Sequence, residues 1–247
     1  MLEKCDYIFG IRAVIEAAEA GKEIDKVLVR NDLHGDLARE LMQVLKERRV
    51  PVQKVPAEKI DRITRKNHQG VLAILSAVTY QSLSAIVPAI YEEGRMPFIV
   101  LLDGITDVRN FGAIARTCEC AGVDALVIPK RGSVGVNGDA MKTSAGALNY
   151  LPVCRETSIL NAVKFLKDCG VTVVAASEKS DLLYTRADLT GPVAIVMGAE
   201  DVGISEDVLR FCDRTLAIPQ AGQIGSLNVS VAAGVMIYEV VRQRLSC

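Results

Sequence analysis

The sequence predicts an α/β protein whose larger, C-terminal part is built on a parallel sheet. Short apolar runs alternate with segments of helical spacing along the whole chain. Two of these runs, 98–102 and 193–197, contain only apolar residues, which is typical of strands buried on both faces of a sheet. The chain has 247 residues, 50% apolar and 24% charged, and this composition is that of an ordinary soluble globular protein.

The first 78 residues are predicted to form a smaller α/β unit of their own. Helical spacing predicts helices over 8–20, 36–49 and 57–64. Apolar runs predict strands over 26–29, 50–55 and 70–75. Pro51 indicates that the strand over 50–55 lies near a sheet edge. Gly21 is suited to the end of the first helix.

Residues 79–96 are predicted to link this unit to a second unit over 97–247. The linker has a weak pattern, with room for a short helix over 83–90. In the second unit, the predicted strands cover 98–102, 125–128, 151–154, 171–175, 193–197 and 216–218. The predicted helices cover 111–121, 139–148, 159–168, 206–211 and a long stretch after Asn228. This alternation favours a parallel sheet with helices on both faces.

Composition argues against several classes of protein. No segment has the pattern of a signal peptide, and no apolar run approaches the ~18 residues of a membrane span. The seven cysteines form no C-x-x-C pair, and His34 and His68 are the only histidines, so we expect no metal site. Cys118 and Cys120 are expected to be packing residues of a helix. These features predict a reduced, cytoplasmic protein.

One stretch of the chain is strongly basic although the whole chain has a net charge of −1. Residues 46–66 hold eight basic against three acidic side chains, a net charge of +5 over 21 residues. A patch of this kind can neutralise several phosphates of a nucleic acid. The alternative is a solvated helix face that happens to be basic.

Three stretches of the second unit, 101–123, 195–205 and 218–235, share one design. Each joins a buried strand, a loop with glycine and polar side chains, and a following helix. Such loops at strand ends are where open α/β sheets bind ligands. Neither G-x-G-x-x-G nor G-x-x-x-x-G-K-[ST] follows any predicted strand, which argues against a nicotinamide or a nucleoside triphosphate as the ligand.

The motifs in these stretches resemble those of the SpoU/TrmH-type RNA ribose 2′-O-methyltransferases of the SPOUT class. The motif positions are Asp107, Asn110, Gly112, Ala113 and Arg116 in the first stretch, 197–200 and Gly203 in the second, and Ile218, Pro219, Gly222 and 226–232 in the third. Residues 8–17 and 68–71 resemble the RNA-binding domain of bacterial 23S rRNA guanosine 2′-O-methyltransferases, so the similarity covers essentially the whole chain. Val108 stands where the family usually has proline, a departure that concerns loop rigidity more than chemistry.

The resemblance implies a fold and a set of partners. It implies a C-terminal domain with a deep trefoil knot, an L30e-like RNA-binding domain before it, and S-adenosylmethionine bound in the knot. It also implies a homodimer whose active site mixes residues of both chains. The implied substrate is RNA, most specifically a guanosine of 23S rRNA.

The resemblance assigns five residues to catalysis: Arg116, Asn110, Glu200, Ser226 and Asn228. A ribose 2′-hydroxyl ionises far above neutral pH, whereas the reference pKa of a glutamate is about 4.3, so proton loss should accompany methyl transfer. Arg116 stays protonated and is expected to stabilise charge on O2′ and hold the neighbouring phosphate. Asn110 is expected to orient the ribose or phosphate, and Glu200 to hold Arg116 and the first loop.

The expected cofactor-binding residues are Gly198, Ala199, Ile218, Leu227 and Ala176. Their backbone groups would surround the cofactor, with Ile218 and Leu227 as apolar walls for the adenine. Glycine-rich loops suit this task because the chain must approach the ligand closely. The expected RNA-binding residues are Arg48, Arg49, Arg62, Arg65, Lys66 and His68.

Several alternatives remain open at this stage. Ser226 or Asn228 can simply cap the last helix, Asp107 can cap the helix after the first motif, and His68 can be a structural loop residue. The substrate can be tRNA rather than rRNA, because the N-terminal domain favours rRNA without deciding it. From another class, the chain can be a non-catalytic RNA-binding protein with a vestigial cofactor site. A dinucleotide-dependent oxidoreductase is disfavoured by the missing glycine fingerprint.

Overall fold

The computed structural model describes residues 7–246 and divides the chain into two compact units. The first consists of residues 1–79 and 135–139, and the second of residues 80–134 and 140–247. The range expected as a linker, 79–96, contains helix α4 (Leu83–Glu92). Leu83, Val87 and Ile90 of this helix are buried in the core of the second unit.

The first unit is a four-stranded sheet in the order β1-β4-β2-β3. Its strands are β1 (Tyr7–Phe9), β2 (Ile24–Arg30), β3 (Val52–Val55) and β4 (Val71–Leu75). Strand β4 runs antiparallel to β1 and β2, and β2 runs parallel to β3. The edge position expected for the strand with Pro51 is confirmed, because β3 pairs with β2 alone.

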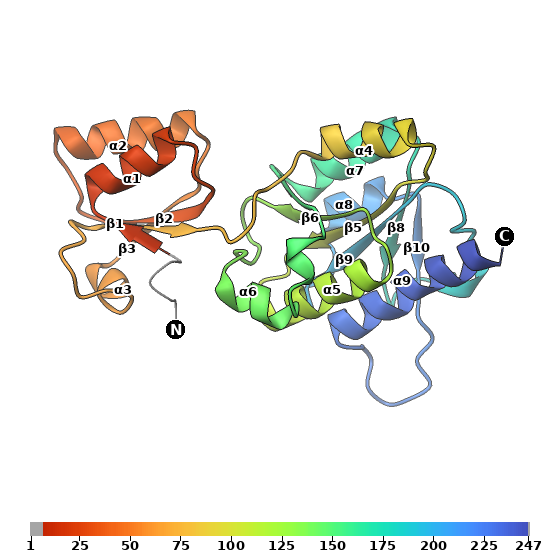
Figure 1. The fold of residues 1–247 in the computed structure, drawn as a ribbon. Coiled ribbons are helices and arrows are strands. Elements are labelled where there is room, and N and C mark those ends of the chain that lie inside the picture. The colour runs from red at the N-terminus through yellow and green to blue at the C-terminus, as the bar shows by residue number, and fades with distance from the viewer. Residues whose placement is uncertain (1–6, 247) are drawn as a thin grey trace. The chain divides into compact units, whose positions relative to one another are not determined.

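Helices cover both faces of this sheet, with α1 (Ile11–Glu19) and α2 (Asp36–Glu47) on one face and α3 (Ala57–Asp61) on the other (Figure 1). Leu41 and Leu45 of α2 pack in one core with Val27 and Val29 of β2. The intervening Leu28 packs in a second core with Ile60 of α3. Since neighbouring strand residues point to opposite faces, the two cores lie on opposite sides of the sheet.

The second unit is a six-stranded, all-parallel sheet in the order β10-β8-β9-β5-β6-β7, which confirms the predicted fold class. The strands are β5 (Phe98–Asp103), β6 (Ala125–Pro129), β7 (Val153–Glu156), β8 (Thr172–Ala176), β9 (Val193–Gly198) and β10 (Arg214–Leu216). The central runs are buried as expected, since the first five residues of both β5 and β9 are shielded from solvent. The trefoil knot implied by the resemblance stays a prediction.

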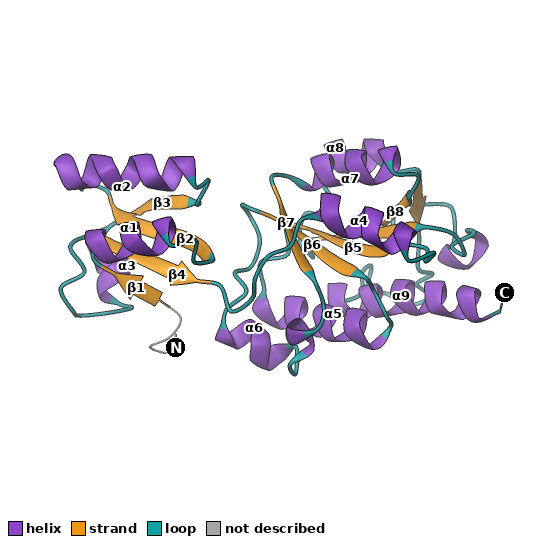
Figure 2. Ribbon diagram, turned by 45° about the horizontal axis from the view of Figure 1, so that its top comes forward, coloured by secondary structure: helices purple, strands orange, loops and turns teal. Residues whose placement is uncertain are grey.

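Two layers of helices cover this sheet, with α4 and α7 (Ile159–Asp168) on one face and α5 (Val108–Cys120) and α9 (Val229–Leu245) on the other (Figure 2). Two short α-helices also occur in this part of the chain, α6 (Gly138–Thr143) and α8 (Glu206–Phe211), the latter before β10. No helix within residues 7–246 is long and apolar enough to cross a membrane.

Several elements differ from the sequence prediction. The helix expected over 57–64 ends at Asp61, and the strand expected over 151–154 covers Val153–Glu156. The helix expected over 8–20 begins at Ile11, because Gly10, with φ of 91°, separates it from strand β1. The helix expected over 139–148 ends at Thr143, since Ala145 and Gly146 both have left-handed backbone. The strand expected over 216–218 ends at Leu216, after which Ala217 pairs with Leu183 instead of β8.

The two neighbouring cysteines of α5 also differ from each other. Cys118 is fully buried, as expected for a packing residue, whereas Cys120 is exposed. Residues two positions apart on a helix point about 200° apart, so when Cys118 faces the core, Cys120 faces the solvent.

Candidate functional site

The loops that follow β5, β9 and β10 all start at the carboxyl ends of the parallel strands, on the same side of the sheet. Strands β5 and β9 are neighbours in register, with Asp103 beside Gly198 at their carboxyl ends. The N–H of Ser205 donates a hydrogen bond to Asp103 Oδ2 over 2.8 Å. This bond ties the loop after β9 to the end of β5.

The loop after β9 is closed on itself by its two glycines. A Cβ atom on Gly198 would lie 2.3 Å from the backbone carbon of Gly203, so no side chain fits there. Gly203 has φ of +71°, which is left-handed backbone that favours glycine. Ala199 and Gly203 exchange backbone hydrogen bonds of 3.2 and 2.9 Å. The closed loop carries Glu200 at the strand end.

The first turn of α5 is held by Asp107, which caps this helix as one alternative anticipated. Its Oδ1 accepts hydrogen bonds from the N–H groups of Arg109 and Asn110 over 2.8 and 2.9 Å. A Cβ atom on Gly112 would lie 2.1 Å from Thr143 Oγ1, so glycine allows α5 to approach the end of α6 closely. The motif glycine therefore has a packing role that fixes where Asn110 lies.

Three residues from the three motifs meet in one hydrogen-bonded cluster. The Nδ2 of Asn228 donates to Glu200 Oε1 over 2.5 Å and to Asn110 Oδ1 over 3.0 Å. The backbone N–H of Val229 is 3.3 Å from the same Glu200 oxygen. Asn228 is also the N-cap of α9, so helix capping and membership of the cluster are combined in one residue. We call Asn110, Glu200 and Asn228 the polar cluster.

Arg116 and Ser226 are not joined to the polar cluster. Arg116 is exposed on α5, and its side chain takes part in no hydrogen bond or ion pair within residues 7–246. The expected pairing of Glu200 with Arg116 is therefore not seen, because Glu200 instead accepts hydrogen bonds from Asn228 and Val229. Ser226 is exposed on the loop before α9.

A cavity of about 220 Å³ lies beside the polar cluster and is lined by the loops after β8, β9 and β10. All five expected cofactor residues line it, namely Ala176, Gly198, Ala199, Ile218 and Leu227. Ser226 and Glu200 line it too. Apolar walls come from strand ends and α8, and carboxylates come from Glu178, Glu200 and Asp201. Such a cavity suits a ligand with an apolar ring system and a positive charge.

The loop after β8 also lines this cavity, through Ser177, Glu178 and Lys179, and its part in the site was not predicted from the sequence. The loop is fixed to β10, since Ser180 Oγ donates to the carbonyl oxygen of Thr215 over 2.7 Å. The available signal was positional, because β8 ends at the same edge as the three strands with motifs. The loop over 177–183 contains no glycine, so it lacks the feature by which the other three loops were recognised in the sequence.

The six expected RNA-binding residues do not form one patch. Arg48 and Arg49 follow α2 on one face of the first sheet, whereas Arg62, Arg65 and Lys66 follow α3 on the opposite face. All five side chains are exposed. The basic stretch of the sequence thus becomes two groups, which we call the α2 group and the α3 group.

His68, the sixth of these residues, is bound within its own loop. Its Nδ1 accepts a hydrogen bond from the N–H of Gly70 over 3.0 Å, so Nε2 carries the proton and donates to Asp61 Oδ1 over 2.9 Å. The side chain is 12% exposed. The neighbouring Gln69 Oε1 accepts from the N–H of Ile11 over 3.1 Å, which joins the two N-terminal patterns of the sequence.

Within residues 7–246, no group of three or more His, Cys, Asp or Glu side chains is arranged to hold a metal ion. Burial raises the pKa of Cys154 to about 12, and burial followed by the charge of Asp213 raises the pKa of Cys212 to about 12. Neither thiol is therefore a nucleophile at neutral pH.

Comparison with known families gives two matches along the chain. The model of the SpoU rRNA Methylase family matches residues 97–238. The model of the RNA 2′-O ribose methyltransferase substrate-binding domain matches residues 7–81. The two matched ranges lie on either side of helix α4.

Three individual proteins are similar to almost the whole chain. A Staphylococcus saprophyticus protein named for the TrmH family of tRNA/rRNA methyltransferases is 36% identical, over 96% of this chain and 95% of its own. The structure of an AdoMet-bound rRNA methyltransferase from Sinorhizobium meliloti is 26% identical, covers 96% of this chain and 87% of its own, and has a TM-score of 0.62. The AdoMet complex of the SpoU methyltransferase AviRb from Streptomyces viridochromogenes is 27% identical, covers 98% and 91%, and has a TM-score of 0.61.

Proposed function

The chain belongs to the SpoU rRNA methylase family, and we propose that it methylates a ribose 2′-hydroxyl in RNA with S-adenosylmethionine as methyl donor. The proposed target is a guanosine of 23S rRNA. The observation that carries the proposal is the meeting of Asn110, Glu200 and Asn228, from three separate motifs, beside a cavity of about 220 Å³.

The lining of the cavity suits the methyl donor in polarity and charge. Ile218 and Leu227 provide apolar contacts for an adenine ring, and Gly198 permits close backbone approach. The donor carries a positively charged sulfonium, which supplies the methyl group and is a good leaving group. Three lining carboxylates and one lysine, Lys179, give the cavity a negative balance that suits this charge.

The motif residues have distinct proposed roles. The guanidinium group of Arg116 stabilises the negative charge that develops on the ribose oxygen. Asn110 orients the ribose or its phosphate, and Ser226 contacts the substrate at the cavity. Glu200 holds Asn228 and the N-terminus of α9 through one oxygen, and its second oxygen has no partner within residues 7–246. Positioning of the two reactants supplies much of the acceleration.

The first unit, over 1–78, is proposed to hold the RNA. Its match to a substrate-binding domain supports this role, and the α2 and α3 groups supply exposed positive charge. The S. meliloti neighbour, which spans both units of this chain, is an rRNA methyltransferase, and this favours rRNA over tRNA.

A homodimer is proposed as the active form. Val231, Tyr238 and Leu245 are spaced by seven residues along α9 and are 53%, 49% and 82% exposed. Residues seven apart lie on one helix face, so α9 presents an apolar stripe that a second copy of this chain can bury.

The proposal is tested by calorimetry and by mapping of ribose methylation. S-adenosylmethionine should bind the purified protein, and incubation with unmethylated 23S rRNA should yield a single 2′-O-methylguanosine. Methylation of tRNA alone would move the assignment to a tRNA methyltransferase. RNA binding without affinity for the methyl donor would favour the non-catalytic RNA-binding alternative.

A further inference from the structure

One backbone group fixes the hydrogen-bond direction throughout the polar cluster. The backbone N–H of Ser230 can only donate, and it donates to Asn228 Oδ1 over 3.0 Å. The hydroxyl of Ser230 lies 2.5 Å from the same oxygen. The amide oxygen of Asn228 is thereby held by α9, and its amide nitrogen is the atom that meets Glu200 and Asn110.

This orientation dictates how Asn110 is turned. Asn228 Nδ2 has two hydrogens, and it uses them on Glu200 Oε1 and on Asn110 Oδ1. Because the nitrogen of Asn228 donates, the Asn110 atom that faces it must be the oxygen. The NH2 group of Asn110 is then left without a hydrogen-bond partner within residues 7–246.

We propose that Ser230 is a positioning residue that acts through Asn228, and that Asn110 acts on the RNA as a hydrogen-bond donor. The inference rests on the proposed function. A free NH2 group is suited to a phosphate oxygen or a ribose oxygen of the target nucleotide. Ser230 stabilises this arrangement because its hydroxyl and its N–H hold the same oxygen of Asn228.

Enzyme kinetics test the role of Ser230 with a matched control. Ser230→Ala should lower kcat/KM for RNA roughly fivefold, the effect of one lost hydrogen bond, and leave the Kd of the methyl donor within about twofold. Ser230→Thr keeps the hydroxyl and should restore the rate. Ser246→Ala, which removes a hydroxyl that bonds the carbonyl of Arg242 at the other end of α9, should change nothing.

A double-mutant cycle separates positioning from general stability. In an Asn110→Ala background, Ser230→Ala should have less than about a twofold further effect, because coupled residues are not additive. A full fivefold further loss in that background would overturn the coupling. So would a loss caused by Ser230→Ala that Ser230→Thr fails to restore.

Nuclear magnetic resonance of the free protein tests the orientation itself and needs no activity. The side-chain NH2 protons of Asn228 should exchange slowly with water, and those of Asn110 should exchange rapidly. The two pairs of resonances are assigned by their loss in Asn228→Asp and Asn110→Asp. Protected Asn110 protons beside rapidly exchanging Asn228 protons would overturn the inference.

The methylation assay and the exchange measurement together separate this inference from the proposed function. If the wild-type protein methylates no RNA but shows the expected exchange pattern, the proposed function fails and the orientation stands. If methylation occurs and the exchange pattern is reversed, the function stands and the role given to Ser230 and Asn110 fails.

Discussion

Asn228 donates a hydrogen bond to Glu200 over 2.5 Å and thereby joins the start of α9 to the loop after β9. The two residues are 28 positions apart, and strand β10 and its following loop lie between them in the sequence. Any ligand in the adjoining cavity contacts loops whose geometry this bond sets. Disturbing either loop should therefore change ligand binding as well as catalysis.

Gly198→Ala should abolish binding of the methyl donor. The new Cβ would lie 2.3 Å from the backbone of both Gly203 and Ile204, so the loop must shift. Overpacking of this kind typically costs about 1–3 kcal/mol of unfolding free energy. Gly191→Ala is the control, since a Cβ there meets nothing within 4 Å. The affinity of both variants for the methyl donor is measured by calorimetry. An unchanged affinity in Gly198→Ala would contradict the proposed role of Gly198 in binding the donor.

Asp107→Ala should impair catalysis through the position of Asn110. The substitution removes the acceptor for the N–H groups of Arg109 and Asn110 and costs roughly 1 kcal/mol of helix stability. Asp107→Asn keeps a capping oxygen and should keep most of the activity. Thermal unfolding and kcat/KM measure the two effects. Equal activity of both variants and the wild type would show that capping does not position Asn110.

Neutralising the α2 group and neutralising the α3 group should change the salt dependence of RNA affinity by different amounts. The α2 and α3 groups lie on opposite faces of one sheet, so a single RNA duplex is not expected to engage both equally. Each lost phosphate contact should reduce the slope of log affinity against log salt by up to ~0.9. Arg62→Ala/Arg65→Ala/Lys66→Ala is compared with Arg48→Ala/Arg49→Ala in filter-binding titrations. Unchanged slopes in both variants would show that neither group contacts phosphates, and would favour the alternative that both are solvated surfaces that happen to be basic.

Glu239 should make folding stability depend on pH in the acid range. Its hydrogen bonds from Arg242, followed by one from Gln243, lower the pKa of the carboxyl in the folded state. A lowered pKa contributes stability above the unfolded value of about 4.3, and this contribution is lost as the pH falls through the folded pKa. Glu239→Gln should therefore flatten the fall in stability below about pH 4.3, as measured by urea unfolding. An identical acid limb in both proteins would contradict this.

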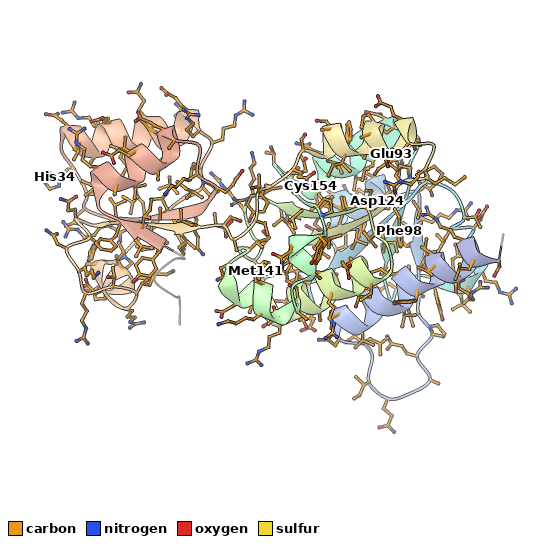
Figure 3. The ribbon with its side chains drawn as sticks, viewed as in Figure 1. His34, Glu93, Phe98, Asp124, Met141 and Cys154 are labelled. Atoms are coloured by element: carbon orange, nitrogen blue, oxygen red, sulfur yellow. The ribbon has the colours of Figure 1, made fainter. Side chains whose placement is uncertain are left out.

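Glu239 also stabilises the segment before β9, through Gln243. Its carboxylate also accepts from Gln243 Nε2, and Gln243 bonds the carbonyl of Ala187 and the N–H of Leu189. This chain of bonds ties the segment before β9 to α9. The neighbouring Arg244 donates a hydrogen bond to the carbonyl oxygen of Pro97. Pro97 precedes Phe98, the first residue of β5, which is labelled in Figure 3.

The parallel sheet was predictable from the sequence because its strands are buried on both faces. An uninterrupted apolar run such as 193–197 carries that signal without any knowledge of its neighbours. Strand β1 could not be predicted in the same way. Its residues continue the apolar spacing of α1, and only the backbone of Gly10 separates the two elements.

The positions of the candidate site were predictable from the sequence, because the motifs place polar residues directly after strands. The hydrogen-bond partners of those residues were not predictable, because they depend on how the loops pack in the fold. Glu200 could be expected near Arg116 on chemical grounds, yet its oxygen is used by Asn228, which has to cap α9 at the same place. The basic stretch was continuous in sequence, and β3 between α2 and α3 carries the chain from one face of the sheet to the other.

The proposed function is tested most directly by nucleoside analysis of 23S rRNA after incubation with S-adenosylmethionine and either the wild-type protein or Arg116→Ala. The wild type should produce 2′-O-methylguanosine. Arg116→Ala should produce none while binding the methyl donor normally, because Arg116 is exposed on α5 and does not line the cavity. A wild-type protein that methylates a base would contradict the proposed ribose methylation. An Arg116→Ala protein that remains fully active would contradict the role proposed for Arg116.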